Sequence, residues 1–384
     1  MYSSASMLNE NSEISLAVAT VYKGKEYKDI KIGTIRYFML PLKGHSMLKY
    51  NRHLESYWYM IRQDFNPDIV HIHGTEYPHG LSYVRACGGE NVVVSIQGLL
   101  SSYYRYYYSG LTGVEIARNI TYRDILRQDN IFQQKKKMER RSKYEREVLS
   151  SVNHIIGRTS WDRAHSWAIN PKAQYHYCNE TLRPSFYKHV WSYENCEKHS
   201  IFMSQAGSPI KGLHQMLKAM SIVRKFYPDT KLYIAGDDIS NKPWYKLSGY
   251  GKIIMSLLDK LSLKEHVFFT GPLDEKSICK RYLKSNVFIC PSTIENSPNS
   301  LCEAQLLGMP YLASYVGGIS DLTYGRERWL YRFEEYEMLA WKVCNIFKVE
   351  REANVDEVVK IRHDAEINRN TLLDIYNDIL KCLQ

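Results

Sequence analysis

Short apolar runs alternate with amphipathic stretches along the second half of the chain. The runs are SIFMSQA (200–206), KLYIAG (231–236), VFFTG (267–271), NVFICPS (286–292) and PYLASYVGG (310–318). Between them apolar residues recur at helical spacing, as in LHQMLKAMSIVRKF, and two helical stretches, 334–349 and 353–383, end the chain. Apolar strands that alternate with helices are typical of a parallel sheet covered on both faces. We therefore predict a doubly wound α/β domain here.

The first half repeats this pattern with longer insertions. EISLAVATVY (13–22), DIVHIHG (68–74), NVVVSIQG (91–98) and NHIIGRTS (153–160) are strand-like, and a long, mostly helical stretch separates the last two. We predict two Rossmann-like domains, 1–190 and 201–350, joined by the polar segment 191–200. The last segment, 351–384, is predicted to be a helix that returns to the first domain. Two such domains would bind a ligand in the cleft between their strand ends.

Composition narrows the class of protein. A chain of 384 residues exceeds one ordinary core, and 44% hydrophobic with 24% charged residues is usual for a soluble protein. We find no run of about 18 apolar residues that would cross a membrane, and the N-terminus lacks the features of a signal peptide. The eight cysteines are scattered, with no CxxC pair. Such thiols indicate a cytoplasmic protein.

The net charge of +10 lies almost wholly in the first half. Residues 1–190 carry 26 Lys and Arg against 17 Asp and Glu, whereas residues 191–384 carry 25 against 24. A basic excess in one half of the chain attracts an anionic partner. The charge balance alone does not decide whether this partner is nucleic acid, a membrane face or a phosphorylated substrate.

The stretch ENSPNSLCEAQ places Glu295 and Glu303 on either side of a predicted helix start. Ser300 and Glu303 fit the S-x-x-E capping box, so Glu303 has a structural role open to it. In the functional interpretation, the N–H groups of residues 299–301 hold a phosphate at the helix start. Glu303 would then bind ribose hydroxyls, and Glu295 would face the group attached to the phosphates. A glycosidase-type carboxylate pair is less favoured, because hydrolysis needs no phosphate-binding helix start.

Two further elements point to the same edge of the predicted sheet. In GSPIKG, Lys211 lies in a strand-to-helix loop, where its ammonium could neutralise a leaving diphosphate. The alternative is an ordinary surface lysine. In VGGIS, Gly317 and Gly318 allow the backbone to approach a ligand closely, or else form a tight turn.

Taken in order, SPIKGLHQMLKAM, YIAGDD, FFTGPL and CPSTIENSPNSLCEAQLLGMPYLASYVGG resemble the group 1 glycosyltransferases, also called family 4. The resemblance covers residues 199–320 and extends more loosely over the first half. It implies a retaining enzyme with the GT-B fold, two Rossmann-like domains that face each other across a cleft. It also implies a nucleotide-sugar donor, UDP- or GDP-linked, with no cofactor and no metal.

The resemblance carries roles onto individual residues. Glu295 and Lys211 would act at the transferred sugar and the diphosphate, and Glu303 would bind the ribose. The full donor-binding set is Lys211, Gly236, Gly271, Leu273, Glu295, Asn299, Ser300, Leu301, Glu303, Gly317 and Gly318.

Three departures from the family pattern stand out. Ala206 occupies the position of an arginine that normally accompanies the lysine, so one positive charge is missing. Gln97 occupies the place of a histidine, and a glutamine can donate a hydrogen bond but cannot act as a base. Family members normally open with an apolar strand and a glycine-rich loop before the helix that leads to EISLAVA, so we expect the N-terminal domain to lack its first strand.

The acceptor side is predicted around HIHGTEYPHG. His73, Glu76, His79 and Gln97 are the candidate residues there, with His73 as a catalytic candidate. His71 shares a strand face with His73 and is expected to be a packed or hydrogen-bonded imidazole. A metal site here is disfavoured, because a third ligand would have to come from elsewhere.

The segments SSYYRYYYSG (101–110) and KKKMERRSK (135–143) interleave basic and aromatic residues. They fit a solvated helix beside a partly buried tyrosine cluster. They equally fit docking of residues 101–146 on the anionic inner face of a membrane. A nucleic-acid partner would use the same residues, but the nucleotide-sugar signature makes it unnecessary.

The sequence thus predicts a cytoplasmic, retaining glycosyltransferase of surface polysaccharide synthesis. It would transfer a sugar, of hexosyl or related type, to a saccharide or lipid-linked acceptor. Two alternatives stay open: a nucleotide-sugar epimerase on the same fold, and a non-catalytic protein that binds nucleotide sugars or assembles polysaccharide.

Overall fold

The computed structural model describes residue 5 and residues 8–9, 13–42, 44, 46–323 and 325–383 of the chain. Its internal contacts divide the chain into two compact units. Unit 1 comprises Met1–Ser102, Met138–Thr181 and Arg362–Gln384, and unit 2 comprises Tyr103–Lys137 and Leu182–Ile361.

Unit 2 is built on a six-stranded sheet in the order β10-β9-β8-β11-β12-β13, in which every neighbouring pair is parallel. The strands are β8 (Glu197–Met203), β9 (Lys231–Ile234), β10 (Val267–Phe269), β11 (Ser285–Cys290), β12 (Tyr311–Ser314) and β13 (Leu330–Tyr331). In chain order this is 3-2-1-4-5-6, the order of a Rossmann sheet. The predicted doubly wound domain is confirmed.

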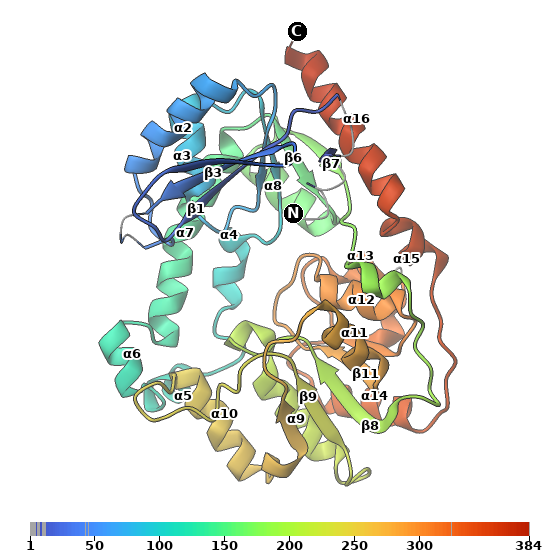
Figure 1. The fold of residues 1–384 in the computed structure, drawn as a ribbon. Coiled ribbons are helices and arrows are strands. Elements are labelled where there is room, and N and C mark those ends of the chain that lie inside the picture. The colour runs from blue at the N-terminus through green and yellow to red at the C-terminus, as the bar shows by residue number, and fades with distance from the viewer. Residues whose placement is uncertain are drawn as a thin grey trace. The chain divides into compact units, whose positions relative to one another are not determined.

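Helices lie along both faces of this sheet (Figure 1). They are α9 (Leu213–Val223), α10 (Gly249–Lys260), α11 (Glu275–Leu283), α12 (Asn299–Leu306), α13 (Ile319–Thr323), α14 (Tyr336–Phe347) and α15 (Glu357–Arg362). Short 3₁₀ turns at Pro184–Tyr187 (η2), Pro209–Lys211 (η3), Lys264–His266 (η4) and Glu327–Trp329 (η5) complete the connections.

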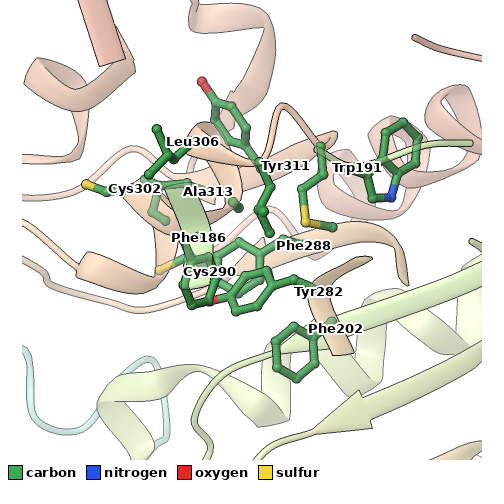
Figure 2. Packing of buried hydrophobic residues seen from close by; sticks show 14 of the residues in the cluster. Phe186, Trp191, Phe202, Tyr282, Phe288, Cys290, Cys302, Leu306, Tyr311 and Ala313 are labelled. Atoms are coloured by element: carbon green, nitrogen blue, oxygen red, sulfur yellow. The ribbon is translucent and has the colours of Figure 1, made fainter. Parts of the chain in front are cut away.

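One face of the sheet carries a core rich in aromatic rings. Phe202 of β8 and Phe288 of β11 pack there against Tyr282 of α11, with ring centroids 4.8 and 5.1 Å away. Figure 2 shows these rings together with Phe186 and the adjoining cluster. The strand residues on either side of Phe202 and Phe288 are buried as well, so the strands are covered on both faces. This explains why they read as continuous apolar runs.

Residues 103–137 lie far from unit 2 in sequence but belong to it. They form η1 (Tyr104–Tyr106), α5 (Gly113–Arg118), α6 (Tyr122–Arg127) and the first residues of α7 (Ile131–Ser150). Both α5 and α6 begin with capping boxes, Thr112 with Glu115 and Thr121 with Asp124. We call residues 103–137 the arm.

Unit 1 contains two sheets. The first has the order β4-β5-β6-β7, all parallel, from β4 (Val70–His73), β5 (Val92–Ser95), β6 (His154–Gly157) and β7 (Gln174–Tyr177). The second has the order β1-β3-β2, from β1 (Ala17–Tyr22), β2 (Lys28–Ile32) and β3 (Ile35–Pro41). β1 and β3 are parallel, whereas β2 and β3 form a hairpin around Gly33.

The helices of unit 1 bury both faces of the first sheet. They are α2 (His53–Phe65), α3 (His79–Cys87), α4 (Leu100–Tyr103), the rest of α7, α8 (Ser160–Ile169) and α16 (Ala365–Leu383). Val92 and Val94 join the core formed with α2, α3 and α7, whereas Val93 joins the core formed with α16. The alternation along β5 therefore fixes the place of the C-terminal helix in unit 1.

The observed units differ from the predicted division. Besides the arm, the segment 182–190 belongs to unit 2, which the sequence assigned to the first domain. Trp191, in the predicted linker, is 1% exposed, and its indole N–H donates to the Ser285 carbonyl at 2.8 Å. The chain passes between the units after residue 181, about ten residues earlier than predicted.

No helix in the described part of the chain has both the length and the apolar character needed to cross a membrane.

Candidate functional site

The candidate ligand site of unit 2 lies at the carboxyl ends of β8 and β11. These two strands are neighbours at the centre of the sheet, and the chain runs outward from them in opposite directions. In an open parallel sheet a ligand binds at such a switch point, outside the carboxyl ends of the strands. The loops that follow β8 and β11 carry Lys211 and Glu295.

Lys211 and Glu295 form an ion pair, with Nζ 2.7 Å from Oε1. The Ser292 hydroxyl donates to the same oxygen at 2.7 Å. Glu295 is 7% exposed, and the Lys211 side chain is 28% exposed. Burial lowers the pKa of Lys211, but the Glu295 carboxylate outweighs this and raises it overall. Lys211 is therefore a fixed cation at the switch point, in contact with a carboxylate rather than extended into solvent.

Two glycines allow the loops around this pair to approach each other. At Gly212, φ is +73° and an added Cβ would lie 1.8 Å from the Pro291 carbonyl oxygen. At Gly317, φ is +54° and an added Cβ would lie 1.9 Å from the Glu295 carbonyl oxygen. The Gly318 N–H donates to that same oxygen at 3.0 Å. The VGG turn thus packs on the backbone of Glu295, so Gly317 and Gly318 belong to one cluster with Lys211.

Helix α12 begins directly after this loop. Its N-cap is Pro298, and no side chain caps it. Of the three predicted phosphate-binding amides, the Leu301 N–H already donates to the Pro298 carbonyl at 3.0 Å. Asn299 is exposed and Ser300 is half-buried. Asn299 and Ser300 therefore form the solvent-facing part of the helix start, at the positive end of the helix dipole.

Glu303 makes an ion pair that the sequence analysis missed. Its carboxylate accepts two hydrogen bonds from Arg183, Nε to Oε1 at 2.7 Å and Nη2 to Oε2 at 2.6 Å. The capping-box alternative for Ser300 and Glu303 is therefore wrong. Burial raises the pKa of the Glu303 carboxyl, and Arg183 opposes that rise. Arg183 stands in NETLRPSFY, where an arginine just before a proline gave no periodic signal.

Gly236, Gly271 and Leu273 lie at the next strand ends. The Gly236 N–H donates to the Gly271 carbonyl at 2.9 Å, which joins the ends of β9 and β10. Both glycines have positive φ, +103° and +72°, and an added Cβ would meet nothing within 4 Å at either. Leu273 is partly buried against the aromatic core. The family resemblance implies that Gly271 and Leu273 line the pocket for the nucleotide base, and the space beside Gly271 is open.

The arm reaches the loop that carries Glu295. The Asn296 N–H donates to the Tyr103 hydroxyl at 2.9 Å, and the hydroxyl groups of Ser109 and Thr293 lie 2.8 Å apart. His214 of α9 holds the Ser109 carbonyl from the other side, with Nε2 at 2.8 Å. These contacts join segments separated by more than 100 residues, so spacing along the sequence could not have indicated them.

In unit 1, three of the four acceptor-side candidates gather at the carboxyl ends of β4 and β5. A Cβ added to Gly74 would lie 2.4 Å from Glu76 Oε2 and 3.3 Å from Gln97 Cγ. The Gln97 amide donates to Glu180 at 2.7 Å, and Glu76 accepts from the Gly98 N–H at 3.0 Å. His73 ends β4 beside them. Burial lowers its pKa to about 4, so its imidazole is neutral at pH 7.

The remaining histidines of this region are also neutral. His79 starts α3 and stacks on Tyr77, and burial lowers its pKa to about 4. His71 packs on His73 and hydrogen-bonds Tyr376 of α16 and Ser95, as expected for a packed imidazole. Among the described residues, no group of three or more His, Cys, Asp or Glu side chains is placed to hold a metal ion.

Parts of the chain are similar to known glycosyltransferases. Residues 192–358 match the model of the family "Glycosyl transferases group 1". Over 125 residues the chain is 29% identical to "Uncharacterized glycosyltransferase MJ1059" of Methanocaldococcus jannaschii. That stretch is 32% of this chain and 28% of the relative, so the alignment spans little more than a quarter of the relative's length.

Three solved structures share the fold. Sucrose-phosphate synthase from Thermosynechococcus elongatus superposes with a TM-score of 0.65 at 14% identity, over 99% of this chain and 90% of that one. WaaG, described as a glycosyltransferase involved in lipopolysaccharide biosynthesis, gives 0.61 at 14%, over 99% and 93%. HepE from Anabaena, in complex with UDP and glucose, gives 0.58 at 14%, over 89% and 86%. The chain therefore has the GT-B fold of two Rossmann-like domains.

Proposed function

We propose that this protein is a retaining glycosyltransferase that takes its sugar from a nucleotide diphosphate. The observation that carries the proposal is the joining of Lys211 and Glu295 at 2.7 Å at the switch point of unit 2, beside the start of α12. A cation, a carboxylate and a helix start are the groups that a sugar diphosphate requires. The match of residues 192–358 to the group 1 family supports the same class.

In the proposed reaction, the bond between the sugar C1 and the diphosphate oxygen breaks, and a bond from C1 to the acceptor oxygen forms on the same face. Lys211 and the helix start stabilise the charge that develops on the diphosphate. The acceptor hydroxyl gives its proton to the departing phosphate oxygen, so no protein nucleophile takes part. Glu295 would accept a hydrogen bond from a hydroxyl of the sugar. No cofactor enters the scheme.

Glu76, Gln97 and His73 of unit 1 are proposed to bind the acceptor, a saccharide or a lipid-linked saccharide of surface polysaccharide synthesis. A glutamine and a neutral histidine donate and accept hydrogen bonds without carrying charge, which suits sugar hydroxyls. We place the protein in the cytoplasm, with the basic residues of 101–146 contacting the anionic inner face of the membrane.

The test begins with isothermal titration of the purified chain against UDP and GDP. We expect one of them to bind, and we expect the corresponding sugar nucleotides to release nucleoside diphosphate when an acceptor is present. Glu295→Gln should lower kcat by about a hundredfold, the usual cost of removing one polar transition-state contact. The matched control is Glu334→Gln, because Glu334 is exposed on the surface of unit 2.

Two results would refute the proposal: neither nucleotide binding, or Glu295→Gln retaining the rate of the control. Conversion of a UDP-sugar to its epimer with no release of UDP would identify the epimerase instead.

A further inference from the structure

Arg183 and Glu303 form a two-pronged ion pair at the edge of the candidate donor site. Arg183 directly precedes η2, and Glu303 lies in the second turn of α12. Two parallel bonds of 2.7 and 2.6 Å join Nε and Nη2 to the two carboxylate oxygens. Charge-assisted bonds are roughly twice as strong as neutral hydrogen bonds, and the paired geometry adds to their specificity. Nothing in the proposed reaction uses Arg183.

The guanidinium lies on the solvent side of the pair. The Glu303 side chain is 3% exposed, whereas the Arg183 side chain is 38% exposed. A ribose that binds Glu303 through its two neighbouring hydroxyls would donate two parallel hydrogen bonds to the same two oxygens. Arg183 makes those two bonds in this structure. A nucleotide whose ribose binds Glu303 must therefore first displace Arg183 from the two carboxylate oxygens.

Lys211 and Glu295 show the same relation. Each of the two carboxylates proposed to bind a donor hydroxyl is paired with a cation, and each cation is more exposed than its carboxylate. A diphosphate brings about two negative charges at neutral pH. Lys211 supplies one positive charge, and Ala206, buried after β8, supplies none. The phosphate charge thus exceeds what Lys211 alone neutralises.

Arg183 has the donors to make up this difference. Within the described residues, its recorded hydrogen bonds use Nε and Nη2, which leaves the two N–H groups of Nη1 available. Cζ of Arg183 lies over the ring of the buried Phe186, 5.0 Å from the ring centroid, so the guanidinium has room to move only away from this ring.

From these contacts we infer that Arg183 is a donor-binding residue: when the ribose takes Glu303, the guanidinium moves onto the phosphate groups of the same nucleotide. This rests on the proposed function, because it requires a nucleoside diphosphate at the switch point. It makes Arg183 the second cation of the site, supplied from the segment before β8 rather than from the loop after it.

The experiment compares UDP with uridine by isothermal titration, or GDP with guanosine if GDP is the nucleotide that binds. Arg183→Met removes the charge and keeps the length of the side chain. We expect it to weaken binding of the diphosphate at least tenfold and to change binding of the nucleoside less than threefold. Arg326→Met is the control, because Arg326 likewise pairs with a carboxylate of the same unit, that of Asp356.

Arg183→Met leaves the Glu303 carboxylate buried without its partner, which would destabilise the fold. A second background separates this effect from the loss of phosphate binding. Arg183→Met is therefore also measured in Glu303→Gln protein, in which position 303 carries no charge, with thermal melts of each variant. The phosphate-dependent loss should persist in this pair. Arg183→Lys should recover part of the lost diphosphate binding, because a lysine restores the positive charge but not the paired N–H groups of the guanidinium.

The outcomes separate the two proposals. If the unaltered chain binds neither UDP nor GDP, the proposed function fails and this inference fails with it. If the chain binds UDP, but Arg183→Met changes UDP and uridine binding by the same factor in both backgrounds, the inference alone is overturned. Arg183 would then act only through Glu303.

Discussion

At the scale of single residues, His214 shows how burial sets a charge state. The imidazole is 1% exposed, with Nε2 2.8 Å from the Ser109 carbonyl and Nδ1 3.1 Å from the Tyr250 hydroxyl. The carbonyl can only accept, so Nε2 carries the proton and Nδ1 accepts from the hydroxyl. The pKa of His214 is lowered to about 4: burial is the largest cause and Lys218 adds to it, while the Ser109 carbonyl and Glu115 oppose the shift.

This pKa predicts a loss of stability in acid. Between about pH 6.5 and pH 4 the unfolded chain binds a proton at His214 and the folded chain does not, so stability falls as pH falls. At pH 5 the cost is roughly 2 kcal/mol. Between neutral pH and pH 5, the free energy of urea unfolding should therefore fall less in His214→Gln than in the unaltered chain, by about that amount. Exposed His189→Gln is the control, and equal pH slopes in both variants would contradict the prediction.

The site residues divide according to what a sequence can reveal. Lys211, Glu295 and the two glycines of VGG come from loops that directly follow apolar strands, and strand order brings such loops together. Arg183 and Tyr103 could not be found in this way. Their partners, Glu303 and Asn296, lie 120 and 193 residues away, and no periodic pattern encodes a contact of that kind.

At the scale of elements, Glu145 of α7 joins two loops of unit 1. It is 1% exposed, and its carboxylate accepts from the N–H groups of Leu100 and Ser101, both at 2.8 Å, and from the Thr75 hydroxyl at 2.9 Å. These partners follow β5 and β4. The loops that carry Glu76 and Gln97 are therefore held to α7 by one side chain.

Replacing Glu145 with glutamine should destabilise unit 1. The amide nitrogen of glutamine cannot accept, so at least one buried N–H group loses its partner, at a cost of about 1–3 kcal/mol. Chemical denaturation compared with Glu139→Gln, an exposed glutamate on the same helix, measures this cost. Equal stability of the two variants would show that the contacts of Glu145 contribute nothing to the fold.

The sequence revealed some strands and not others, and the difference lies in how deeply each strand is buried. Those buried on both faces, such as β5 and β11, stand out as continuous apolar runs. β2 is exposed along its whole length and β7 is mostly polar, so neither gave that signal. The hairpin of β2 and β3 was readable from the alternation on both sides of Gly33 but was missed.

At the scale of the whole molecule, the chain passes four times between its two units. The sequence predicted the two Rossmann-like domains but placed residues 101–146 wholly in the first. Local hydrophobic pattern shows that a helix has an apolar face, and it does not show which core that face joins. Because the stretch is divided between the two units, its residues are not equally available for the proposed contact with a membrane.

Part of the basic and aromatic stretch is engaged inside the protein. Tyr107 and Ser109 are buried, Lys135 lies over the Tyr108 ring at 4.4 Å, and Lys137 contacts Asp129 at 3.2 Å. Further along α7, Arg140, Lys143 and Arg146 are exposed. If the chain docks on an anionic bilayer, these three side chains are better placed to do so than the tyrosine cluster.

Replacing Arg140, Lys143 and Arg146 together with glutamine should therefore weaken binding to vesicles that contain phosphatidylserine. Each basic residue near such a surface contributes about 1 kcal/mol, so the triple variant should lose roughly a hundredfold in affinity by co-sedimentation. The control removes the same charge from exposed positions of unit 2, Lys225, Lys260 and Lys348. Binding should also disappear at about 0.5 M salt, since charges at a surface are screened there. Equal losses in both triple variants would mean that net charge alone attracts the protein, and undiminished binding to neutral vesicles would exclude an electrostatic origin altogether.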